Sequence, residues 1–122
     1  MPAITQSDLD QLMTAHPTLT SEGYGRSTLV PADKEPDLRA DLASDLTSVQ
    51  QAADWIGELG WTSATSDDSP SSYHLKHVME EATGRYVTNG ALIAAALLVG
   101  VPVKLDGLNP PIGVSPQSLR TA

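Results

Sequence analysis

A run of nine apolar residues, Ala91 to Val99, constrains the fold of this chain more than any other feature. Thr88 or Asn89 can cap a helix that contains this run, and Gly100 can end it. A membrane span needs about 20 residues, so the run is too short to cross a bilayer. A helix that is apolar on every side must be surrounded by protein. We therefore expect residues 89–99 to form the central helix of the core.

Other segments show the residue spacing of helices that could pack around this core. Residues 37–59 carry an apolar stripe at three- and four-residue steps, with a break near 45–47, where Ser48 and Gln51 fit a capping box that restarts the helix. Residues 72–83 form a further predicted helix, which Ser71 or Ser72 can cap and Gly84 can end. A short helix that starts at Ser7 and ends before Pro17 is expected near the N-terminus.

The predicted fold class is mainly α, as a small α+β domain with a helical core and a short C-terminal β-hairpin. Asp106-Gly107 between two apolar runs favours the hairpin, and Pro110 and Pro111 confine its second arm to an edge. At 122 residues, a single domain is expected. Its predicted parts are an acidic, loop-rich segment with a short strand at 27–30 (1–35), the core with its hairpin (36–114) and a tail (115–122).

Charge and cysteine content exclude several classes of function. The chain has a net charge of −8: residues 1–68 hold 12 acids and 3 bases (−9), and residues 69–122 hold 3 acids and 4 bases (+1). This excess of negative charge disfavours binding to nucleic-acid backbones. The absence of cysteine excludes disulfides and thiol chemistry. With neither a signal peptide nor a membrane span visible, a cytoplasmic protein without membrane contact is expected.

Polar side chains are concentrated beside the apolar run. They predict an exposed binding patch on and after the helix at 72–83, formed by Tyr73, Lys76, His77, Glu81, Arg85, Tyr86 and Asn89. A polar surface supported by a rigid core helix is typical of a non-enzymatic protein that binds a partner protein, and this is the preferred hypothesis. The small residues of the run would also allow a homodimer if one side of the central helix were left uncovered.

Two chemical alternatives stay open. His74, His77 and Glu81 fall on one side of a helix, and such a set can hold a divalent metal or shuttle a proton in a small hydrolase. The spacing differs from that of metalloproteases, no fourth ligand stands out and no nucleophile elbow is present. We therefore expect neither a metal nor a cofactor, and favour a protein that is not an enzyme.

Two alternatives concern nucleic acid. The helices around Gly84 have the spacing of a helix–turn–helix DNA-binding regulator, but residues 91–99 offer no side chain that reads bases. An acidic protein can also mimic nucleic acid and inhibit a host defence protein. The acids that could line one flank of the long helix are Asp33, Glu35, Asp37, Asp41 and Asp45.

Residues 71–96 carry the pattern S-S-Y-x-L-K-H, an acid four positions later, and then Y-V-T-N-G-x-x-I-A-A-A. This pattern resembles a family of small phage-, prophage- and plasmid-associated proteins of unknown function. The resemblance covers about residues 47–110, and Asn109 matches a later asparagine. This chain departs from the family at residues 62–70, which carry Asp67 and Asp68 where the family tends to be basic, and in the prolines after Asn109. The resemblance implies an accessory protein of a mobile element, and no activity.

Overall fold

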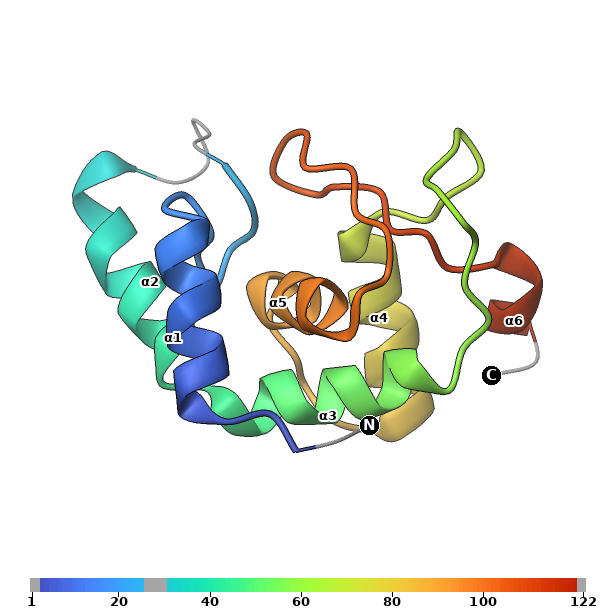
Figure 1. The fold of residues 1–122 in the computed structure, drawn as a ribbon, viewed down its shortest axis with the longest axis horizontal. Helices are drawn as coiled ribbons and strands as arrows, with labels where there is room; N and C mark the ends of the chain where they lie inside the picture. Colours follow the sequence, from blue (N-terminus) through green and yellow to red (C-terminus); the bar gives the residue numbers. More distant parts are fainter. Residues whose placement is uncertain (1–2, 26–30, 121–122) are drawn as a thin grey trace.

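The apolar run forms the buried centre of the molecule. The computed structural model describes residues 3–25 and 31–120, apart from the side chain of Arg120. In Figure 1, α5 (Asn89–Val99) lies at the centre, with α1 (Gln6–Ala15), α3 (Leu46–Gly57) and α4 (Ser72–Thr83) packed around it. Residues 91–96 are fully buried, which confirms the predicted central helix. None of the described helices is both long and apolar enough to traverse a bilayer.

The ends of α4 and α5 follow the capping residues that the sequence suggests. The hydroxyl of Ser71 accepts a hydrogen bond from the backbone N–H of His74, and the hydroxyl of Thr88 accepts one from that of Ala91, each at 3.1 Å. These bonds satisfy N–H groups that the first turn of a helix leaves open. Gly84 and Gly100 end the two helices in the left-handed conformation.

The helical stripe at 37–59 is divided into two helices close to the break predicted near 45–47. A 3₁₀ turn, η1 (Ala32–Lys34), leads into α2 (Glu35–Ala43), and α3 begins at Leu46. The hydroxyl of Ser44 donates to the carbonyl of Ala40 at 2.8 Å, a local bond of the kind that competes with helix continuation. Asp45 precedes α3 without a side-chain cap, so the predicted Ser48–Gln51 capping box is wrong.

The N-terminal helix begins earlier than predicted because a different residue caps it. The hydroxyl of Thr5 accepts from the backbone N–H of Asp8 at 3.1 Å, and the carboxylate of Asp8 accepts from that of Thr5 at 2.9 Å. This reciprocal pair is a capping box, and it replaces Ser7 as the start of α1.

The predicted C-terminal β-hairpin is wrong, because the described residues contain isolated bridges and no β-strand. The chain does reverse direction near Gly107, and Val103 pairs with Ile112 in one antiparallel bridge. Pro102, Pro110 and Pro111 have no N–H to donate, so the pairing cannot extend into a ladder. The fold is mainly α and not α+β.

Two smaller predictions concern the segment at 27–30 and the C-terminal residues. The short strand predicted at 27–30 lies outside the described residues. Residues 115–122 were expected to form an irregular tail, but they include a one-turn helix, α6 (Pro116–Arg120), beside the end of α3 in Figure 1.

A partly buried arginine joins α1 to α2. The guanidinium of Arg39 donates to three backbone carbonyls at and after the end of α1, those of Met13 (2.7 Å), His16 (2.9 Å) and Leu19 (2.8 Å). A cation is favourable at this end of a helix, where the carbonyls lack partners within the helix. Arg39 therefore positions both the end of α1 and the start of the turn at residues 18–25.

The same turn lies against the first residues of α5, and Gly90 makes this approach possible. The backbone N–H of Gly90 donates to the carbonyl of Ser21 at 3.0 Å. A Cβ atom added at Gly90 would lie 1.9 Å from the carbonyl oxygen of Thr20, well inside van der Waals contact. Only glycine fits here while the turn keeps its place.

Replacing Gly90 by alanine should therefore destabilise the fold strongly. We expect Gly90→Ala to lower the free energy of unfolding by about 3 kcal/mol in urea denaturation, because the backbone at Thr20 must move away from α5. Gly57→Ala is the matched control: its Cβ meets no atom within 4 Å, and alanine should add about 0.5 kcal/mol through helix propensity. Equal unfolding midpoints for Gly90→Ala and the unmodified chain would contradict the close packing.

Candidate binding site

A cavity of about 370 Å³ opens where α4, the start of α5 and two loops meet. The loops are the turn at 18–25 and the segment around 108–109, which are far apart in the sequence and both lie above α5 in Figure 1. We call this space the α4–α5 cavity. It is lined by Ser21, Glu22, Tyr73, Lys76, Tyr86, Thr88, Asn89, Leu108 and Asn109.

Asn89 joins the three backbone segments of the cavity. Its side chain is almost fully buried, and its Nδ2 atom donates to the carbonyl of Glu22 (3.0 Å), the Oδ1 atom of Asn109 (2.7 Å) and, more weakly, the carbonyl of Leu108 (3.3 Å). All three neighbours of Nδ2 are acceptors, which fixes the orientation of the amide. The Oδ1 atom of Asn89 is buried and has no hydrogen-bond donor among the described residues.

Lys76 lines the cavity but is largely buried, in contrast to the exposed position predicted for it. Its ammonium group lies 2.8 Å from a carboxylate oxygen of Glu80 and 4.7 Å from the centre of the Tyr86 ring. The same oxygen of Glu80 accepts the backbone N–H of Val87 at 3.1 Å. Glu80 thus holds Lys76 over Tyr86 and also fixes the link between α4 and α5.

The surroundings of Glu80 keep its carboxylate ionised. Burial alone would raise its pKa, but the hydrogen bonds from Lys76 and Val87 and the nearby positive charges outweigh this, and the net effect is a pKa below the usual 4.5. The carboxylate of Glu80 is therefore ionised at neutral pH beside the ammonium group of Lys76. The net charge of the pair is zero.

Exposed aromatic rings flank the cavity. Tyr73 is 51% exposed and Tyr86 is 73% exposed, and both line the opening. The ring of His77 meets the ring of Tyr73 edge-on at a centroid distance of 4.5 Å, just outside the lining. Two exposed tyrosines beside a concave surface are typical of a binding site, because each ring offers a large contact area with few rotatable bonds.

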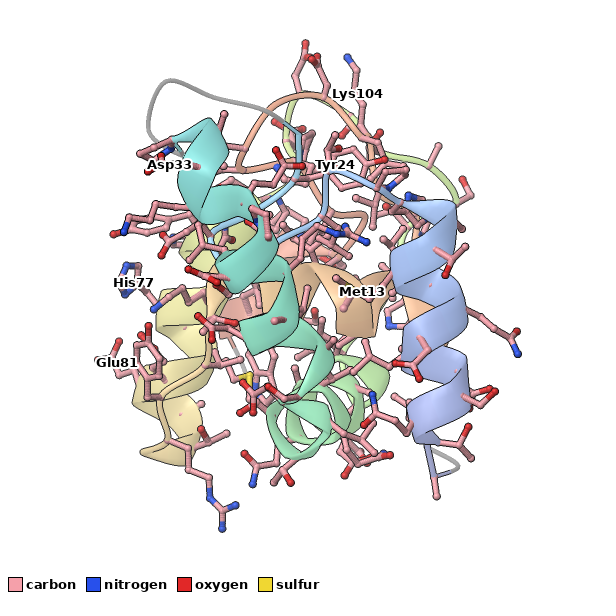
Figure 2. The ribbon with its side chains drawn as sticks, turned by 90° about the vertical axis from the view of Figure 1, so that its left-hand side faces the viewer. Met13, Tyr24, Asp33, His77, Glu81 and Lys104 are labelled. Atoms are coloured by element: carbon pink, nitrogen blue, oxygen red, sulfur yellow. The ribbon has the colours of Figure 1, made fainter. Side chains whose placement is uncertain are left out.

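The predicted patch is divided by the structure. Tyr73, Lys76, Tyr86 and Asn89 come together at the α4–α5 cavity, where Lys76 and Asn89 are buried and the two tyrosines are exposed. The other three members lie outside the lining. Figure 2 shows His77 and Glu81 pointing away from the body of the protein along α4. Arg85 lines a separate groove beside Trp55 and Met79.

Sequence reasoning missed the loops that complete the site. Ser21, Glu22 and Leu108 carry no motif of their own, and their position follows from the close approach at Gly90 and the bonds of Asn89. Asn109 was marked only by the family resemblance. His77 Nδ1 lies 3.4 Å from Glu80 Oε1.

The candidate metal ligands do not form a metal centre. Among residues 3–25 and 31–120, no three His, Asp or Glu side chains are close enough together to hold an ion. His74, His77 and Glu81 are all exposed positions on one face of α4, and no second element brings a ligand to them.

Comparisons with protein-family models, with characterised proteins and with solved structures found no match to this chain. The function must therefore be argued from the cavity itself and from the surface around it.

The lowered pKa of Glu80 predicts a pH-dependent contribution to stability. This contribution is fully present above the ordinary pKa of 4.5 and is lost as the pH falls through the lower pKa of the folded state. We expect Glu80→Gln to reduce the free energy of unfolding by about 1–2 kcal/mol at pH 7, through loss of the charged bonds to Lys76 and Val87. The measurement is urea unfolding from about pH 7 to pH 3.

The difference between Glu80→Gln and the unmodified chain should narrow below pH 4.5. Glu81→Gln removes the same charge from the neighbouring exposed position and should cost less than about 0.5 kcal/mol. A loss of equal size in both variants would show that Glu80 acts only through overall charge.

Proposed function

We propose that this chain is a non-enzymatic binding protein that recognises a partner protein at the α4–α5 cavity and the two tyrosines at its opening. The observation that carries the proposal is the combination of a concave, built site with exposed Tyr73 and Tyr86. Protein interfaces place tyrosines at their centre, where the ring is buried by the partner and the hydroxyl keeps a hydrogen bond.

The buried layer beneath the opening supports a role in recognition. Lys76 donates to Glu80, and Glu80 also accepts the backbone N–H of Val87. Asn89 donates to the backbone carbonyl of Glu22. These bonds hold the buried layer in place without a ligand. A site that is ordered in advance loses little conformational entropy on binding.

The proposal extends to origin and location. The resemblance of residues 47–110 to phage- and plasmid-associated proteins supports an accessory role in a mobile element, acting on a protein of the bacterial cytoplasm. Self-association stays a prediction: residues 91–96 of α5 are covered within one copy, and the remaining apolar residues of that helix are the partly buried Leu97, Leu98 and Val99.

Mimicry of nucleic acid is the second candidate, and one arrangement favours it. Asp33, Asp37 and Asp41 are exposed at four-residue steps along η1 and α2, and Figure 2 shows Asp33 on the same side of the molecule as His77. A row of carboxylates can occupy a basic groove that otherwise accepts phosphates.

Loss of the tyrosine rings should abolish partner capture. We expect affinity purification from a bacterial lysate, with the full chain as bait, to retain proteins that Tyr73→Ala and Tyr86→Ala each lose by about tenfold or more, as read by quantitative mass spectrometry. His74→Ala is the matched control, because it removes an exposed ring from the same helix outside the cavity. If all four baits retain the same proteins, the cavity is not the binding surface.

A further inference from the structure

The positively charged donor and the helix N–H groups at the α4–α5 cavity are already in use, which argues against an anionic ligand. The ammonium group of Lys76 is paired with Glu80 and covered by the ring of Tyr86. The start of α5 would attract an anion only through open N–H groups. Those of Gly90, Ala91 and Leu92 donate to Ser21, to the Thr88 hydroxyl and to the Thr88 carbonyl.

The acceptors around the cavity are less fully used. Glu22 is the one acidic residue among those that line the cavity, and it is exposed. The Oδ1 atom of Asn89 is buried without a donor in the described part of the chain, which is a cost to the folded state that a ligand N–H would remove. The exposed rings of Tyr73 and Tyr86 add electron-rich surfaces, although the ammonium group of Lys76 already lies over one side of the Tyr86 ring.

Charge points in the same direction. Because Lys76 and Glu80 neutralise each other, the remaining formal charge at the cavity is that of Glu22. The whole chain carries −8, which attracts positively charged partners and raises their rate of association.

We propose that the α4–α5 cavity binds an arginine side chain presented by a basic partner protein, an inference that rests on the proposed function and specifies its ligand. A guanidinium group is planar, carries five N–H donors and stacks on aromatic rings, so it can use the tyrosine faces, the Glu22 carboxylate and the Asn89 acceptor together. An ammonium group has no plane to stack and is more strongly hydrated, so lysine binds more weakly here.

Asn89 Oδ1 is closed to solvent in the empty cavity, so the guanidinium reaches it by displacing a side chain at the opening. Tyr86 is the more exposed of the two tyrosines, so we expect its side chain to move most readily. Among the described residues, the contact of its ring with Lys76 is the interaction that holds the Tyr86 side chain, and its hydroxyl makes no hydrogen bond there. Entry of the ligand should therefore be visible at both Asn89 and Tyr86.

The test is an NMR titration of the ¹⁵N-labelled full chain with Nα-acetyl-arginine amide. The comparison ligands, at matched ionic strength, are Nα-acetyl-lysine amide, Nα-acetyl-glutamate amide and inorganic phosphate. We expect saturable shifts of the Asn89 side-chain amide and of the Tyr86 and Glu22 backbone amides with the arginine compound, at an affinity at least threefold above that for the lysine compound.

Glu22→Gln keeps the shape of the side chain and should weaken arginine binding about fivefold or more. Glu58→Gln is the matched control: it removes the same charge from an exposed position at the end of α3, away from the cavity, and should change affinity less than twofold. Arginine binding that is equal in the two variants, or absent in the unmodified chain, overturns the inference. Saturation of the same residues by phosphate or by the glutamate compound also overturns it, in favour of an anion site.

The two proposals can fail separately. If Tyr73→Ala and Tyr86→Ala lose captured proteins while the arginine compound does not bind, the binding surface stands and arginine is rejected as its ligand. If arginine binds with the predicted dependence on Glu22 but capture is unaffected by the tyrosine variants, the cavity chemistry stands and its role in protein capture is rejected.

Discussion

The contact between the turn at 18–25 and the first residues of α5 is the constraint on which the candidate site depends. Gly90 lets the backbone of Thr20 approach where any side chain would collide, and Asn89 then binds the carbonyl of Glu22 from one loop and Asn109 from another. These two adjacent residues connect the N-terminal turn, the core helix and the C-terminal loop. Without the junction, the residues of the two loops would not line one cavity together with those of α4.

Much of the helical framework could be predicted because its causes are local. The apolar run, the caps at Ser71 and Thr88 and the glycines that end α4 and α5 are each visible in a few neighbouring letters of the sequence. The predicted hairpin does not form, for an equally local reason: three prolines remove N–H donors from both arms, so the segments on either side of Gly107 form a single β-bridge. The start of α1 was misplaced because Thr5 and Asp8 form a better cap than Ser7.

The site was harder to predict than the helices, since it depends on long-range contacts. Tyr73, Lys76, Tyr86 and Asn89 were placed in one patch because they are close in sequence, and the structure does bring them together. Periodicity could not show that Lys76 and Asn89 are buried. Lys76 is covered by Glu80, one helical turn away, and by Tyr86, whereas Asn89 is covered by loops that are distant in the sequence. Nor could periodicity show that Glu22, 67 residues before Asn89, supplies a wall of the cavity.

The three bonds of Arg39 have an effect beyond joining two helices. They hold the carbonyl of Leu19 within the turn at 18–25, which also carries Ser21 and Glu22, and a further bond links the N–H of Ser21 to the carbonyl of Leu38 on α2. The turn that carries Ser21 and Glu22 is thus fixed to the α1–α2 pair. A ligand that binds Glu22 would therefore reduce the motion of α1 and α2 without touching them. Conversely, a substitution on α2 would change how easily the turn at 18–25 moves at the opening of the cavity.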